Sequence, residues 1–83
     1  MTFPGLLPVN ANEEATFEKG NKCKKKGDEL GNDLGNEECA NRIKSQCPVP
    51  YGQNKEKDGC YCCLDNKKKD GPSSYYFISF VNS

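Results

Sequence analysis

Three of the six cysteines of this chain lie within five residues, in the stretch Gly-Cys-Tyr-Cys-Cys that runs from Gly59 to Cys63. In an extended strand, successive side chains alternate between the two faces, so Cys60 and Cys62 would point to one side and Cys63 to the other. A fold that contains this stretch must therefore supply partners for sulfur atoms on both sides of one strand.

Disulfide bonds explain the cysteines better than a zinc site or a catalytic thiol. The chain has only 83 residues and cannot be held firmly by apolar contacts alone. An even number of cysteines is typical of a disulfide framework formed in an oxidising compartment. The absence of histidine disfavours zinc and leaves a nucleophilic cysteine without a base. We therefore expect a secreted, extracellular protein without metal, cofactor or enzymatic activity, whose disulfides use Cys23, Cys39, Cys47, Cys60, Cys62 and Cys63.

The segment NEECANRIKSQC predicts one short helix. It begins at Asn36, whose side chain is suited to N-capping, and two glutamates follow in the first turn, where the helix dipole favours acids. Cys39, Ile43 and Cys47 fall at positions i, i+4 and i+8, so one stripe of the helix carries both sulfurs and the isoleucine. Pro48 disfavours helical geometry at the preceding residue and should end the helix.

Two segments after the helix predict strands. Residues 60–64 should be extended, and the tail YYFISFVN is rich in aromatic and β-branched residues. We expect these two strands to form a hairpin, connected by a basic loop at residues 65–74. The turn formers and charges of residues 48–59 predict an exposed loop, and Gly31 and Gly35 indicate turns that lead into the helix.

The fold class that follows is a small disulfide-rich α+β domain over residues 23–83. One short helix would pack on a β-hairpin or small antiparallel sheet, as in a cystine-stabilised αβ fold. Residues 1–22 contain no cysteine and no sustained periodicity, so we expect them to form a flexible N-terminal arm.

The spacing of the cysteines limits how they can pair. Cys39 and Cys47 lie about 12 Å apart along the helix axis, whereas a disulfide allows about 4.4 to 6.8 Å between α-carbons. Either the helix crosses the strand obliquely, or one helix cysteine bonds elsewhere. Because the sulfur on the other face of the strand needs a partner on that side, we predict a pairing of Cys39 and Cys47 with Cys60 and Cys62, and of Cys23 with Cys63.

A helix with two cysteines followed by Gly-Cys-Tyr-Cys-Cys resembles the secreted defensin-like peptides of flowering plants, in particular embryo surrounding factor and its relatives. The resemblance covers Cys23 to Leu64. It implies a cystine-braced ligand of a cell-surface receptor or, on other branches of these peptides, an antimicrobial peptide or toxin. The disulfide order common to defensins would join Cys23 to Cys60, Cys39 to Cys62 and Cys47 to Cys63.

The charge pattern indicates where such a peptide would bind. The 12 basic and 12 acidic residues cancel, which gives no support for nucleic-acid binding or for obligate membrane binding. The lysines instead form local runs, and lysine and tyrosine side chains can anchor an interface. We expect a monomer that binds a receptor ectodomain. The alternatives are a defensin-like antimicrobial peptide or toxin acting on membranes or channels, and a microbial effector or an inhibitor of a partner enzyme. The predicted partner-binding residues are Lys24, Lys25, Lys26, Lys67, Lys68, Lys69, Tyr51, Tyr75 and Tyr76.

Overall fold

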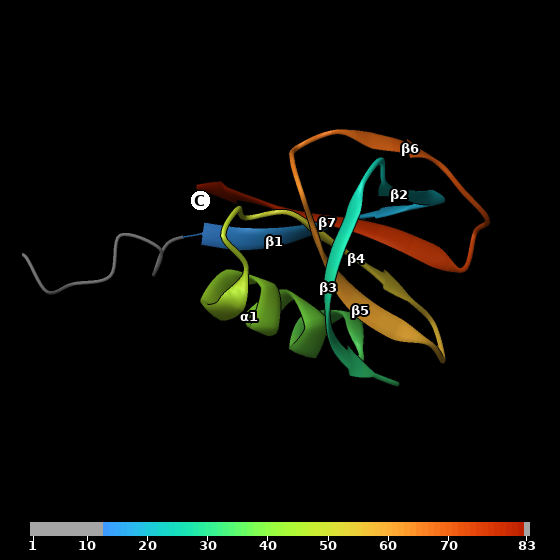
Figure 1. Ribbon diagram of the computed structural model, residues 1–83, viewed down its shortest axis with the longest axis horizontal. Helices are drawn as coiled ribbons and strands as arrows, with labels where there is room; N and C mark the ends of the chain where they lie inside the picture. Colours follow the sequence, from blue (N-terminus) through green and yellow to red (C-terminus); the bar gives the residue numbers. More distant parts are fainter. Residues whose placement is uncertain (1–12, 83) are drawn as a thin grey trace, which may run out of the picture.

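The computed structural model describes residues 13–82, which form three layers (Figure 1). A five-stranded antiparallel sheet lies in the middle, a helix covers one of its faces and a two-stranded sheet covers the other. The prediction of a small disulfide-rich α+β fold with a helix on an antiparallel sheet is confirmed. In chain order the elements are β1 (Glu13–Lys19), β2 (Asn21–Cys23), β3 (Lys26–Asn32), α1 (Asn36–Gln46), β4 (Gly52–Lys55), β5 (Gly59–Cys63), β6 (Lys68–Asp70) and β7 (Tyr75–Asn82).

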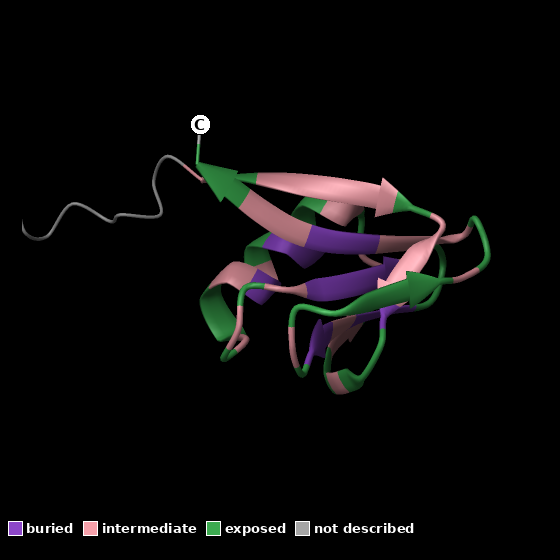
Figure 2. Ribbon diagram, turned by 90° about the horizontal axis from the view of Figure 1, so that it is seen from above, coloured by how far each residue is buried: buried purple, intermediate pink, exposed green. Residues whose placement is uncertain are grey.

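The central sheet has the strand order β1-β7-β4-β5-β3, and its buried residues lie in the inner strands, over most of β4 and β5 and in the middle of β7 (Figure 2). Alternation along β7 sends Ile78 toward the helix and Phe77 toward the two-stranded sheet. Both side chains are buried, at 0% and 3% exposure. The protein therefore has two small apolar clusters, one on each side of the same sheet.

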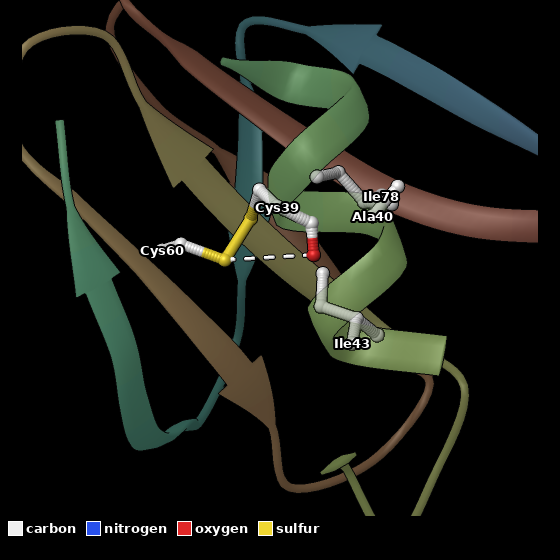
Figure 3. Packing of buried hydrophobic residues seen from close by; sticks show 5 residues of the cluster. All are labelled: Cys39, Ala40, Ile43, Cys60 and Ile78. Atoms are coloured by element: carbon white, nitrogen blue, oxygen red, sulfur yellow. Dashed lines mark hydrogen bonds between the residues drawn. A yellow bond between two sulfur atoms is a disulfide. The ribbon is translucent and has the colours of Figure 1, made fainter. Parts of the chain in front are cut away.

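The cluster on the helix side contains the three buried residues of α1 (Figure 3). Cys39, Ala40 and Ile43 pack against Ile78 of β7, and Cys39 bonds to Cys60 of β5. The helix lies so close to β4 that a Cβ atom at Gly52 would overlap the Ile43 side chain and lie 2.6 Å from the Tyr61 carbonyl oxygen. This close approach explains why a glycine begins β4.

The C-terminal end of the helix agrees with the prediction, and the N-terminal end does not. The helix stops where Pro48 requires, with Cys47 as an extended C-cap residue. The prediction that Asn36 caps the other end was wrong, because Gly35 is the N-cap residue and no side chain of residues 13–82 caps the helix. Asn36 is instead the first helical residue, and its Oδ1 accepts a hydrogen bond of 2.9 Å from Asn54 Nδ2.

The three disulfides follow the pairing predicted from strand alternation rather than the order common to defensins. Cys60 and Cys62 face the helix layer, whereas Cys63 faces the two-stranded sheet. Cys47 reaches its partner because its backbone is already extended (φ −86°, ψ 143°) and no longer follows the helix axis. The bonds and their Cα–Cα distances are Cys39–Cys60 at 5.7 Å, Cys47–Cys62 at 5.6 Å and Cys23–Cys63 at 5.4 Å.

The predicted boundary between an N-terminal arm (residues 1–22) and a domain that starts at residue 23 was wrong. Residues 1–12 of that arm lie outside the described residues, but β1 and β2 belong to the folded domain. β1 pairs with β7 along its whole length, from Glu13 opposite Asn82 to Lys19 opposite Tyr76. β1 was not predicted as a strand because its composition is polar. Only Ala15 and Phe17 of this strand pack against the helix-side cluster.

The predicted hairpin of residues 60–64 with residues 75–82 was also wrong, because β4 lies between β5 and β7. Gly52 of β4 pairs with Cys62 on one side and Ile78 on the other. The loop expected at 48–59 therefore contains a central strand, and the loop expected at 65–74 contains β6. Around Gly31 the chain forms β3 rather than a turn, and it leaves the sheet at Asp33, which has a φ of 58°.

Candidate functional site

The two lysine runs meet in the small two-stranded sheet. β2 and β6 pair antiparallel, with Lys22 opposite Lys69 and Cys23 opposite Lys68. One step further, the backbone N–H of Lys24 donates to the carbonyl oxygen of Lys67 at 3.0 Å. Two segments far apart in sequence thus form one surface. We call it the basic face and define it by Lys22, Lys24, Lys25, Lys26, Lys67, Lys68 and Lys69. Strand alternation places Lys68 on the same side of the small sheet as Cys23, with its Nζ 5.9 Å from the ring centroid of Phe77.

The basic face is anchored to the central sheet through Cys23. This residue is 3% exposed and bonds to Cys63 of β5. Its backbone N–H donates a hydrogen bond of 3.0 Å to Oε1 of Gln53, a buried residue of β4. A covalent bond and a buried hydrogen bond therefore fix the middle of β2, and through strand pairing they also hold β6.

Most lysines of the basic face lack an intramolecular counter-ion. In the part of the chain that the structure describes, the ion pairs join Lys68 to Glu18, Lys55 to Asp58 and Arg42 to Glu38. Only the first of these involves the basic face. Its other lysines have no carboxylate oxygen within 4.0 Å among residues 13–82, and these are Lys22, Lys24, Lys25, Lys26, Lys67 and Lys69.

A concave site with a volume of about 180 Å³ lies in this surface, and we call it the basic hollow. Tyr75 lines the hollow. The ring centroid of Tyr75 lies 4.9 Å from Lys22 Nζ and 5.5 Å from Lys55 Nζ. Beside it, Lys26 Nζ lies 4.3 Å from the ring centroid of Tyr61. The ammonium groups are held over aromatic rings rather than extended freely into water. The lining residues are Lys22, Cys23, Lys24, Lys26, Gln53, Lys69 and Tyr75.

The three tyrosines predicted to bind a partner lie in three different environments. Tyr75 lines the basic hollow, whereas Tyr51 packs on Phe77 with a centroid distance of 6.0 Å and completes the small apolar cluster. Tyr76 follows Tyr75 in β7 and points to the opposite face, where its hydroxyl donates to Glu56 Oε1 at 3.3 Å. The structure therefore joins Tyr75 to the predicted lysines, places Tyr51 in the apolar cluster next to Phe77, over which Lys68 lies, and separates Tyr76 from them.

The sequence-based prediction of the site left out Lys22 and Gln53. Lys22 belongs to the same basic run as Lys24 and could have been included on charge alone. Gln53 gave no signal, because it lies in a polar segment that reads as an exposed loop but forms a buried strand. A buried glutamine in such a segment becomes recognisable only when its hydrogen-bond partner, here the backbone of Cys23, is known.

The cysteines themselves are structural residues in this arrangement. All six form disulfides, so none is a free thiol that could bind zinc or act as a nucleophile. Among residues 13–82 there is no group of three or more Cys, Asp and Glu side chains placed to hold a metal ion. The same residues include no helix long and apolar enough to cross a membrane.

Comparison with known proteins adds no relative from which a function could be transferred. No protein-family model matches the chain, and no match is found among the curated proteins or the solved structures. The resemblance to defensin-like peptides stays a prediction from the cysteine pattern, and the basic face with its hollow is the feature on which a functional proposal can be built.

Proposed function

We propose that this chain is a secreted, cysteine-rich signalling peptide that binds the ectodomain of a cell-surface receptor through its basic face. The observation that carries the proposal is the pairing of β2 with β6, which places Lys22 and Lys24 beside Lys69 and Lys67. A surface of this kind complements an acidic patch on a partner and accelerates association with it. Three disulfides in so short a chain favour an extracellular location.

The anchoring of the basic face supports a role in binding rather than in catalysis. Cys23 is fixed by the bond to Cys63 and by the hydrogen bond to Gln53, so the strand that carries the lysines is ordered before a partner arrives. A preordered surface loses less conformational entropy on binding than a flexible loop does. The lysines that lack a counter-ion are then available to pair with carboxylates or other anions of the partner.

The experiment is to measure the binding of the oxidised protein to a panel of receptor ectodomains by surface plasmon resonance. The test variant is Lys24→Ala with Lys69→Ala, which removes two exposed charges from the basic face. The control variant is Lys19→Ala with Lys57→Ala, which removes two exposed charges elsewhere. We expect the test variant to weaken binding by about tenfold or more, mainly through slower association, and the control to bind normally. Equal effects of the two variants, or no binding to any ectodomain, would contradict the proposal.

A second candidate is a membrane-active peptide, because one exposed apolar side chain adjoins the basic face. Leu64 is 59% exposed, and its backbone N–H donates to the carbonyl oxygen of Lys25 at 2.9 Å. Peptides that bind at the membrane interface combine lysines, which attract anionic lipid, with a neighbouring apolar side chain that inserts into the bilayer. Dye release from anionic vesicles at low micromolar protein, reduced in Leu64→Ser, would favour this candidate over receptor binding.

A further inference from the structure

The basic hollow is lined almost entirely by groups that donate hydrogen bonds. Four of its seven lining residues are lysines, and none is acidic. The side-chain carbonyl oxygen of Gln53 accepts a hydrogen bond from the Cys23 N–H. The side-chain amide nitrogen of Gln53 can therefore still donate hydrogen bonds to a ligand. By contrast, the groove between β1 and α1 is lined by Glu13, Glu14 and Glu37 as well as by Lys44. The hollow therefore suits a ligand group that is negatively charged and only accepts hydrogen bonds.

The volume of the hollow and the type of its basic side chains limit the class of ligand further. Its volume of about 180 Å³ lies below the roughly 300 to 1,000 Å³ of pockets that enclose a drug-sized molecule, so it suits one charged group of a larger ligand. The chain's one arginine, Arg42, lies on the helix layer, and the hollow uses lysines alone. Lysine ammonium groups act as point charges without the planar fork by which arginine binds carboxylate or phosphate in a bidentate way, so several of them can surround one anionic group from different directions.

Three lysines of the hollow, Lys22, Lys24 and Lys69, form a ladder that Lys67 extends beyond it. Lys22 lies opposite Lys69, and Lys24 lies beside Lys67 one rung further, about 6.6 Å along the strand at two residues' rise. Like charges opposite one another on paired strands are unfavourable, so this arrangement costs stability in the free protein. A chain-like ligand with repeated anionic groups would relieve that repulsion at each rung.

The aromatic rings of the basic face argue against single-stranded nucleic acid as this ligand. Proteins that bind single strands without sequence preference stack the bases on open aromatic side chains. Here Lys22 and Lys55 lie over Tyr75, and Lys26 lies over Tyr61. Both tyrosines beside the hollow are thus engaged by ammonium groups of the protein itself, and the surface offers charge rather than a stacking platform.

We propose that the basic hollow binds a sulfate group of a sulfated polysaccharide, and that the lysines of the basic face outside the hollow, among them Lys25 and Lys67, bind its neighbouring sulfates. This inference rests on the proposed function in that it uses the same face and the same extracellular location. It adds a second class of ligand, a carbohydrate polyanion that would hold the protein near the cell surface where a receptor is displayed.

The test is the binding of heparin oligosaccharides to the oxidised protein, measured by isothermal titration calorimetry over a series of NaCl concentrations. We expect the double variant K24A/K69A to reduce the slope of log K against log salt by about two and the affinity at physiological salt by about tenfold or more. K19A/K57A, with the same net charge, should leave both unchanged. Fully desulfated heparin and a single-stranded DNA of matched charge should bind at least tenfold more weakly than heparin. Retained binding of the desulfated chain, equal effects of the two variants, or DNA binding as tight as heparin would overturn the inference.

The same variants separate this inference from the proposed function. If K24A/K69A loses ectodomain binding while wild-type protein shows no affinity for heparin, the polysaccharide site is wrong and the receptor site stands. If wild-type protein binds heparin in a sulfate-dependent way but binds no ectodomain, the proposed function fails and the polysaccharide site stands. Dispersed NMR spectra of each variant establish that a loss of binding does not come from unfolding.

Discussion

The two faces of the central sheet are covered in different ways. On the helix side, two disulfides and a fully buried cluster around Ile43 and Ile78 join α1 to the sheet. On the other side, one disulfide and a smaller cluster around Phe77 hold two short strands whose exposed side chains are mostly lysines. The comparison indicates that the helix side provides most of the apolar stabilisation, whereas the covalent anchor at Cys23 allows the other side to carry repelling charges.

Reduction of all three disulfides should have the largest effect and should remove the difference between the faces. The bonds join residues 15, 21 and 40 positions apart. Each stabilises the folded state by about 3 kcal/mol or more in the chain-entropy model, so together they rival the whole stability of a small domain. We expect dithiothreitol to collapse the dispersed NMR spectrum on both sides. Native shifts that persisted for α1 after full reduction would mean that the helix side is stable without its sulfurs.

Truncation of the helix-side core should have the next largest effect. Ile43 is 0% exposed, so Ile43→Ala leaves a cavity and should lower the free energy of unfolding by about 2 to 5 kcal/mol in urea titrations. Val81→Ala is the matched control, because Val81 is 49% exposed on β7 and its truncation should change the free energy by about 0.5 kcal/mol or less. Similar losses in the two variants would contradict the placement of Ile43 in the buried core.

Removal of one acidic partner from each face should have the smallest effect on stability and should distinguish the faces by binding. Glu18 pairs with Lys68 of the basic face, and Glu38 pairs with Arg42 on α1. Both pairs are partly exposed, so Glu18→Gln and Glu38→Gln should each cost less than about 1 kcal/mol. Only Glu18→Gln releases a charge of the basic face, and it should strengthen heparin binding about twofold. Equal binding by the two variants would show that net charge, and not the face, controls the interaction.

The sequence predicted the helix side of the fold well because its signals are local. One stripe of the helix carries Cys39, Ile43 and Cys47, and alternation in β5 assigns Cys63 to the opposite side. These patterns depend only on the geometry of single elements. They were sufficient to predict the helix, its C-terminal end and the disulfide pairing.

The prediction missed the strands whose burial depends on residues far away in the sequence. β4 has the sequence Gly-Gln-Asn-Lys, yet Gln53 and Asn54 are buried at 4% and 1% exposure. Hydrogen bonds to Cys23 of β2 and to Leu34 in the loop before α1 satisfy the Gln53 carbonyl and the Asn54 amide nitrogen, whereas the buried Asn54 Oδ1 has no partner among the described residues. A hydrophobic pattern cannot identify a central strand whose buried residues are polar.

The sequence predicted which charged residues belong to the candidate site, but not the strand pairing that brings them together. The lysine runs and Tyr75 were predicted to bind a partner, and that stays a prediction, but nothing in the sequence joins β2 to β6. That pairing depends on Gly20, which has a φ of 84° between β1 and β2, and on two backbone hydrogen bonds, from the Gly71 N–H to the Gly20 carbonyl and from the Gly20 N–H to the Tyr75 carbonyl. Long-range contacts of the backbone leave little trace in local composition.

The adjacent cysteines 62 and 63 give this small protein a mechanical property. A pull on the basic face passes from β2 through the Cys23–Cys63 bond into β5, and one residue away the Cys62–Cys47 bond carries it on to the end of the helix. The path crosses all three layers through covalent bonds, without relying on the hydrogen bonds between strands. Separation of the three layers would therefore require the cleavage of sulfur bridges as well as the loss of hydrogen bonds between strands.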